Sequence, residues 1–153
     1  MSDKTDPRDA AINTFRERQA MATQVTGDRA RVEEERARKQ EADLTAWATH
    51  AFGAISTGVT QVSDDFARRG SPFIIRQRPD QRRGIACFEI HRSGHLQREA
   101  TFAFVLNADG LVRAETDAHG ASLPEGIVVA AVTPQWAEQA AEQVMLVVLK
   151  SQH

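Results

Sequence analysis

The sequence predicts an α+β protein: a long N-terminal helix, then an antiparallel sheet of four to five strands, then a C-terminal helix packed on one face of the sheet. Three observations predict this class. Residues 9–69 are rich in helix formers, residues 73–116 alternate apolar and polar side chains between turn signals, and a Thr-Pro pair begins another amphipathic segment at Thr133. We expect a disordered tail at 1–8, a charged helical extension at 9–43 and the α+β domain at 44–153.

The extension at 9–43 has the composition of an exposed helix, because its large apolar residues are sparse. Glu34 precedes Arg38 by four residues, an order that stabilises a helix by about 0.2–0.5 kcal/mol per pair. Val25 and Val32 lie seven residues apart, but the same register continues with Lys39, so a sustained coiled-coil seam is absent. The segment is therefore either a solvated extension or an arm that binds a partner weakly.

Gly27 and Asp28 predict a break inside the N-terminal helical region, with Asp28 as the N-cap of the next helix. The helical region becomes amphipathic over 44–69, so the charged run before it is expected to be an extension that projects beyond the domain. Gly58 would allow close approach of a neighbour, and Gly70 and Pro72 end the helix. Its apolar stripe recurs at spacings of three and four residues and consists of Leu44, Ala48, Ala51, Phe52, Ile55, Val59, Val62 and Phe66.

Four strands are expected in the middle of the chain, at 73–78, 84–91, 95–107 and 111–116. In an antiparallel pair, the numbers of directly opposed residues have a constant sum. Because the apolar residues of these strands are even-numbered, they share one face only if that sum is even. Three-residue loops at 92–94 and 108–110 satisfy this condition, with Gly94 and Gly110 in the left-handed conformation. The expected inner face comprises Ala86, Phe88, Ile90, Leu96, Ala100, Phe102, Phe104, Leu106, Val112 and Ala114.

The last third of the chain predicts a buried strand at 127–132 and a helix that Thr133 caps and Pro134 begins. Residues 144–149 are apolar all round, so they fit either the end of this helix or a strand; the helix is favoured.

Two histidines form a candidate metal site on the outer face of the predicted sheet. The expected hairpin register places His91 directly opposite His95, with Glu89 two residues along the same strand. Cross-strand neighbours lie about 5 Å apart at Cβ, so two imidazoles and a carboxylate would be close enough to share a metal ion. Solvated polar residues on the outer face of a sheet, or a contact with a partner, explain the same pattern.

An arginine cluster forms a candidate site for nucleic acid or an acidic partner. Residues 67–113 carry 9 arginines against 4 acidic residues, while residues 114–153 carry 1 basic and 5 acidic residues. Arginine binds phosphate and carboxylate through paired hydrogen bonds. Charges on an edge strand also prevent aggregation, so the cluster has a structural explanation too. Its members are Arg68, Arg69, Arg76, Arg78, Arg82 and Arg83.

The sequence contains no motif that defines an enzyme, and no cofactor is expected. The single cysteine, Cys87, the polar N-terminus and the lack of a long apolar run predict a cytoplasmic, bacterial-type protein that does not enter a membrane. We expect a non-enzymatic protein-interaction or assembly module that contacts a protein partner, or a second copy in a homodimer, through the extension or the outer sheet face. The alternatives are a nucleic-acid-binding accessory protein that uses the arginine cluster and, third, a small metal- or ligand-binding protein.

Overall fold

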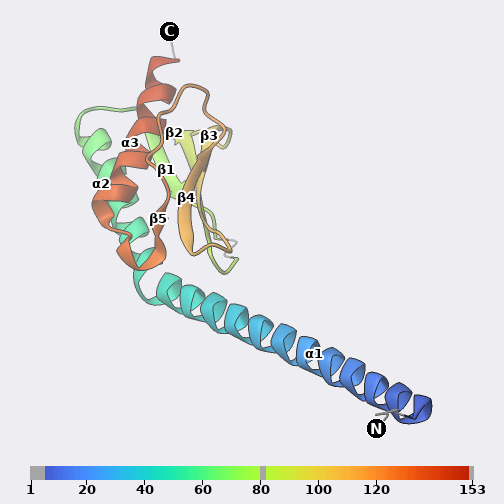
Figure 1. Cartoon of the computed structure of the whole chain (residues 1–153). Coiled ribbons are helices and arrows are strands. Elements are labelled where there is room, and N and C mark those ends of the chain that lie inside the picture. Colours follow the sequence, from blue (N-terminus) through green and yellow to red (C-terminus); the bar gives the residue numbers. More distant parts are fainter. Residues whose placement is uncertain (1–5, 80–81, 152–153) are drawn as a thin grey trace. The chain divides into compact units, whose positions relative to one another are not determined.

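A long helix, a five-stranded antiparallel sheet and a C-terminal helix make up the computed structural model, which describes residues 6–79 and 82–151 (Figure 1). The predicted α+β class is confirmed. The chain divides into two compact units, Met1–Lys39 and Gln40–His153. Most of the expected tail at 1–8 lies outside the described residues, but Pro7 and Arg8 belong to the first helix.

The first helix, α1 (Pro7–Ala46), runs for 40 residues, all of them described and none of them buried. The break predicted at Gly27 is wrong. A lone glycine inside a helix costs only about 1 kcal/mol relative to alanine, which its neighbours can offset. Asp28 does not cap a new helix, because α1 continues through it and the backbone N–H groups that follow it are bonded to carbonyls of the preceding turn. Its carboxylate pairs with Arg31 instead.

A five-residue π-helical segment, η1 (Trp47–Ala51), connects α1 to α2 (Phe52–Arg68). Its wider turn holds Trp47 and Ala51 in the core, and the His50 ring bonds the Val132 carbonyl at 2.8 Å. Gly70 has φ +90° and follows the end of α2, as the sequence predicts. Residues 44–69 thus form one helical path, but not one regular α-helix.

The sheet is a meander in the order β1-β2-β3-β4-β5, with every neighbouring pair antiparallel. The predicted strand at 127–132 is too long: only two residues pair with β4, and a 3₁₀ turn, η2 (Val129–Ala131), follows. Val129 in this turn and Val132 directly after it are buried, and the next residue, Thr133, is the N-cap of the last helix. The strands are β1 (Phe73–Gln77), β2 (Ile85–Arg92), β3 (Arg98–Leu106), β4 (Leu111–Thr116) and β5 (Ile127–Val128).

The last helix, α3 (Pro134–Lys150), begins as predicted, because the Thr133 hydroxyl accepts a hydrogen bond from the Trp136 amide at 3.2 Å. It continues through the apolar residues 144–149, so the helical alternative for this segment is confirmed.

The β3–β4 hairpin has the predicted three-residue loop. Asn107 N–H donates to the Leu111 carbonyl at 2.9 Å, and Gly110 has φ +83°. The β2–β3 hairpin, in contrast, has a longer connection and a β-bulge between Ile90 and His91. Leu96 lies in this connection with 92% of its surface exposed, so its predicted place in the core is wrong.

The aromatic core explains the β2–β3 register. The predicted register would pair Phe88 with Arg98, whereas the observed register pairs Phe88 with Phe102 and stacks their rings at 5.2 Å. Both registers keep the same residues on the inner face, because side chains alternate with a period of two. The hydrophobic pattern therefore predicts the face correctly, and ring packing decides the register.

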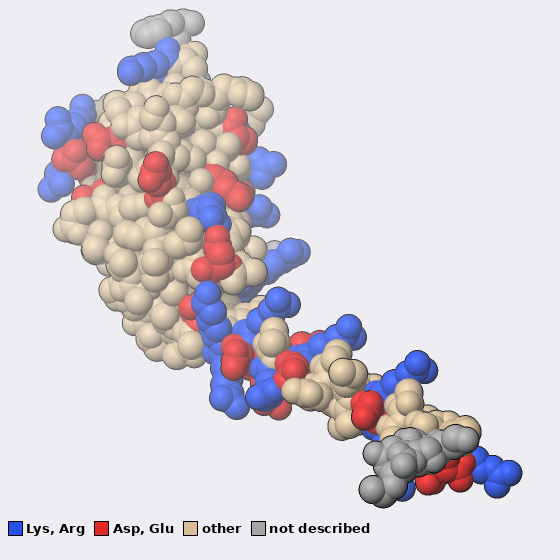
Figure 2. All heavy atoms as spheres, in the orientation of Figure 1, with Lys and Arg blue, Asp and Glu red and all other residues tan. Residues whose placement is uncertain are grey.

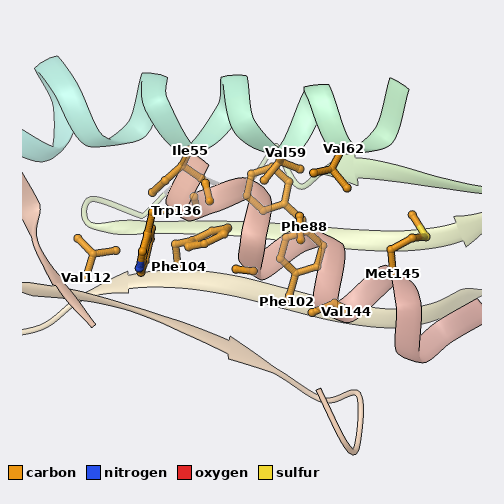
Figure 3. Close-up of a cluster of buried hydrophobic side chains, with 14 of the residues drawn as sticks. Ile55, Val59, Val62, Phe88, Phe102, Phe104, Val112, Trp136, Val144 and Met145 are labelled. Atoms are coloured by element: carbon orange, nitrogen blue, oxygen red, sulfur yellow. The ribbon is translucent and has the colours of Figure 1, made fainter. Parts of the chain in front are cut away.

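Helices α2 and α3 cover one face of the sheet, and their side chains interlock with its aromatic residues (Figures 1 and 3). Figure 3 shows Ile55, Val59 and Val62 of α2 pointing toward the sheet. Trp136 of α3 lies 5.5 Å from the Phe104 ring, and its Nε1–H donates to the Glu125 carbonyl at 3.0 Å.

Gly58 sets the distance between α2 and α3. A Cβ added there would lie 2.3 Å from the Pro134 carbonyl oxygen and 3.0 Å from Ala137 Cβ. Because the first contact is with backbone, Gly58→Ala should destabilise the protein by about 3 kcal/mol, as expected for overpacking between helices. Gly53, in the same helix, has no atom within 4 Å of an added Cβ, so Gly53→Ala should be neutral or stabilising by up to about 1 kcal/mol. Urea unfolding of both variants measures the contrast, and equal stabilities would contradict it.

Candidate interaction surfaces

The outer face of the sheet, opposite α2 and α3, carries two rows of side chains that cross strands β1 to β4. Strand pairing places them side by side, because residues directly opposite in an antiparallel sheet share a face. We name them the first and second outer rows. The first row is Arg78, Cys87, Ala103 and Glu115; the second row is Arg76, Glu89, Thr101 and Asp117.

A hollow of about 430 Å³ lies over the middle of these rows. It exists because the floor residues Cys87 and Ala103 are small, whereas the long side chains stand at the margins. Its β4 side is held by Asp117, whose carboxylate accepts from the Thr101 amide at 2.7 Å. Thr116 Oγ1 donates to the Thr101 carbonyl at 2.8 Å. The hollow is thus a built feature of the face, basic on its β1 side and acidic on its β4 side.

Glu89 is the centre of an ion-pair network on the outer face. His91 Nε2 donates to its carboxylate at 2.9 Å, and Arg78 and Arg98 approach the other carboxylate oxygen at 3.4 and 3.5 Å. The hydrogen bond from His91 lowers the pKa of Glu89 below its ordinary 4.5, and the charges of the two arginines lower it further. Glu89 is therefore held as a carboxylate by its neighbours.

The predicted opposition of His91 and His95 is wrong. The bulge places Arg98 opposite His91, and His95 lies exposed in the β2–β3 connection, where its N–H donates to the Arg92 carbonyl. His91 is buried, and its Nδ1 has no hydrogen-bond partner among the described residues. No group of three His, Cys, Asp or Glu side chains within residues 6–79 and 82–151 is placed to hold a metal ion. Of the candidate metal ligands His91, His95 and Glu89, the structure therefore brings only His91 and Glu89 together, as a hydrogen-bonded pair.

The six arginines of the predicted cluster separate into three pairs. Arg68 and Arg69 end α2, and both pair with Asp65, at 3.6 and 3.0 Å. Arg76 of β1 and Arg78, the residue that follows β1, lie in the two outer rows. The remaining pair, Arg82 and Arg83, follows in the β1–β2 connection.

Only part of this positive charge is available to a ligand. Arg78 pairs with Glu89, and Arg83 pairs with Glu41 at 3.2 Å. Arg76 and Arg82 form no ion pair with any residue in the described ranges. The cluster is therefore not one continuous basic patch.

A smaller hollow of about 260 Å³ joins Arg82 and Arg83 to aromatic residues of the helical region. Trp47 and Phe52 line it, with ring centroids 6.4 Å apart, and Ile85 completes the apolar part. Sequence reasoning missed this combination, because the aromatic residues precede the arginines by about thirty positions. Trp47 immediately precedes Ala48 of the predicted apolar stripe without belonging to it, and this position was the only local signal.

Helix α1 carries five of the large apolar side chains that are exposed among the described residues. Exposed fractions range from 46% for Val32 to 67% for Met21. Both positive and negative side chains lie along α1 on the face that Figure 2 shows, so this face does not carry charge of a single sign. Its exposed large apolar residues are Ile12, Phe15, Met21, Val25 and Val32.

Comparisons of the chain with protein-family models, curated proteins and solved structures found no match. No helix among the described residues is both long and apolar enough to cross a membrane. A functional proposal therefore depends on the surfaces of the chain itself.

The Glu89 network predicts a pH-dependent contribution to stability. A carboxyl group whose pKa is lowered by folding stabilises the protein above its unfolded pKa, and this contribution is lost as the pH falls through the lowered value. Glu89→Gln should cost about 1 kcal/mol at neutral pH, and the difference from wild type should shrink below about pH 4. Thermal unfolding across this pH range measures it, with Glu142→Gln on the exposed side of α3 as the control. A stability difference between wild type and Glu89→Gln that does not change with pH would contradict a contribution from the Glu89 carboxylate.

Proposed function

We propose that the protein is a non-enzymatic interaction or assembly module, and that α1 is the arm that binds a protein partner or a second copy. The observation that carries this proposal is a helix of 40 described residues with none buried. Isolated helices in water are marginally stable, and most helices in proteins are stabilised by packing an apolar face. A partner would supply the packing that α1 lacks.

The distribution of apolar side chains along α1 favours its N-terminal part as the region that contacts the partner. Four of the five large exposed residues lie between Ile12 and Val25, and residues 19–27 contain no charged side chain. Burial of one such side chain contributes about 1.5–3 kcal/mol, so a few anchors are enough for a specific contact. The charged residues from Asp28 to Asp43 would then keep the rest of the helix solvated.

The cytoplasm is the proposed location. The lone thiol of Cys87 is free in the structure, and a protein stabilised by its core rather than by disulfides fits a reducing compartment.

Replacing Phe15, Met21 and Val25 together by glutamine should weaken assembly while preserving the helix, because glutamine is a good helix former. The control replaces three polar residues of the same helix, Asn13, Gln24 and Arg31, by alanine. Light scattering over a range of concentrations measures self-assembly, affinity capture followed by mass spectrometry measures other partners, and circular dichroism checks the helix. Equal masses and equal co-purified proteins for wild type and both variants would contradict a binding role for α1.

The second candidate function is binding of single-stranded nucleic acid, and the aromatic hollow is the observation that favours it. Nucleic-acid bases stack on aromatic rings while arginines contact the phosphates. Phe52 is half-buried and Arg82 is free of ion pairs among the described residues, so both groups are accessible. The modest size of the hollow fits one nucleotide rather than a long track.

If this candidate is correct, oligonucleotide affinity should fall with salt, because each neutralised phosphate releases counterions. Replacing Arg82, which has no ion pair among the described residues, by glutamine should reduce the slope of log affinity against log salt by about 0.7, the value expected for one single-strand phosphate contact. The same replacement of Arg68 and Arg69, which pair with Asp65, serves as the control. Fluorescence anisotropy with mixed single-stranded probes measures both, and absence of binding at low salt would exclude this function.

A further inference from the structure

We infer that the outer sheet face is a two-fold interface for a second copy of this chain. This surface is independent of α1, so the inference goes beyond the proposed function. Helices α2 and α3 cover only the inner face, and the outer face carries half-buried apolar side chains between charged margins. The arrangement of those charges identifies the partner.

The charges of the two outer rows are opposite at the two margins of the face. On β1 the rows end in Arg78 and Arg76, and on β4 they end in Glu115 and Asp117. Between the margins the rows hold small or uncharged side chains, apart from the Glu89 carboxylate, whose charge Arg78 and Arg98 balance. Arg113 of β4 also lies on the outer face, but it pairs with Asp109 at 2.7 Å. In the two outer rows the β1 margin is therefore basic and the β4 margin acidic, an arrangement that is complementary to a second copy related by a two-fold rotation.

The direction of the two-fold axis follows from the strands. For two sheets packed face to face, the axis lies between them and parallel to both. If it runs along the strands midway between β2 and β3, the β1 margin of one copy lies over the β4 margin of the other. An axis perpendicular to the strands would place β1 over β1 and set arginine against arginine, which like-charge repulsion disfavours.

The axis along the strands gives each row a complementary set of contacts. In the first outer row, Arg78 faces Glu115 of the second copy, and Cys87 faces Ala103. In the second outer row, Arg76 faces Asp117. A guanidinium has five N–H donors, so Arg78 keeps its ion pair with Glu89 while it meets a second carboxylate.

An apolar strip lies along the same axis. Ile85 pairs with Val105 within the sheet, and both are half-buried on the outer face. The axis places Ile85 of one copy over Val105 of the other, next to the contact between Cys87 and Ala103. Along the axis the interface thus has apolar or small side chains at Ile85, Val105, Cys87 and Ala103, followed by the ion-paired Glu89 in the second outer row. Charged side chains lie along both margins, as they do at the rim of many protein–protein interfaces.

The alternative self-contact, strand addition at the β1 edge, is blocked within the chain. The Ile75 amide donates to Ser63 Oγ at 3.4 Å, and the Phe73 amide donates to Ser71 Oγ at 3.2 Å. These edge N–H groups have partners already, so a second strand would have to displace them.

The size of the face predicts a weak dimer. Four strands spaced about 4.8 Å apart, with about six residues each at roughly 3.3 Å, give a surface of roughly 20 by 20 Å. This is smaller than the roughly 800 Å² per partner of a standard interface. Dimerisation should therefore depend on concentration and weaken with salt.

The test uses two charge reversals, Arg78→Glu and Glu115→Arg, each followed by sedimentation equilibrium at low salt. Each reversal alone creates like-charge contacts at two symmetric places, so each variant should dimerise about tenfold or more weakly than wild type. Mixed in equal amounts, the two variants restore both opposite-charge contacts, so a heterodimer should form. Native mass spectrometry identifies the heterodimer directly. Arg68→Glu, at the end of α2, is the matched control and should dimerise like wild type.

Two further measurements keep the result interpretable if a reversal disturbs folding. Thermal unfolding compares each variant with wild type. Alkylation of Cys87 in the unmodified chain should slow as protein concentration rises, because dimerisation covers this half-buried thiol.

A wild type that stays monomeric, with a concentration-independent alkylation rate, would overturn the interface. So would reversals that leave dimerisation unchanged, or a mixture that fails to recover it. The outcomes separate this interface from the arm: loss of assembly on substitution of the α1 apolar residues, without any effect of the sheet reversals, would support α1 and exclude the sheet face.

Discussion

The stack of aromatic rings on the inner face of the sheet is the interaction on which the rest of the domain depends. Phe88 and Phe102 lie 5.2 Å apart in a stacked arrangement, and Phe104 meets both edge-on at 6.0 Å. Trp136 of α3 packs against Phe104 at 5.5 Å, so the same cluster holds the C-terminal helix. These rings bury large areas and prefer specific geometries, which makes the register of β2 and β3 costly to change.

The inner register has a direct consequence for the outer face. Once Phe88 is paired with Phe102, the residues on either side of that pair are fixed, so Cys87 must lie opposite Ala103 and Glu89 opposite Thr101. The hollow, the ion pairs of Glu89 and the opposed charged margins all follow from this alignment. A core interaction thus organises a surface that the core does not touch.

The helices of the chain illustrate two sources of helix stability. In α2 and α3, close approach at Gly58 and a continuous apolar face provide the packing, and charges matter little. In α1, exposed ion pairs such as Arg38 with Glu34 contribute only a few tenths of a kcal/mol each. The exposed Phe15 and Met21 add nothing to the helix until a partner covers them. This difference is the physical reason for proposing an interaction role for α1.

The sequence by itself determined the α+β class, the element order, the inner-face residues other than Leu96, the end of α2 at Gly70, the β3–β4 turn and the cap at Thr133. These features depend on local signals: periodicity, glycine conformation and capping side chains. Tertiary structure alone decided the β2–β3 register, the uninterrupted helix at Gly27, the π-helical turn at Trp47 and the separation of the arginines into three pairs. A register shift that preserves the alternation of faces leaves the pattern unchanged, and the sequence cannot show which distant side chains pack together. Ring packing and long-range ion pairs therefore decided what the local pattern left open.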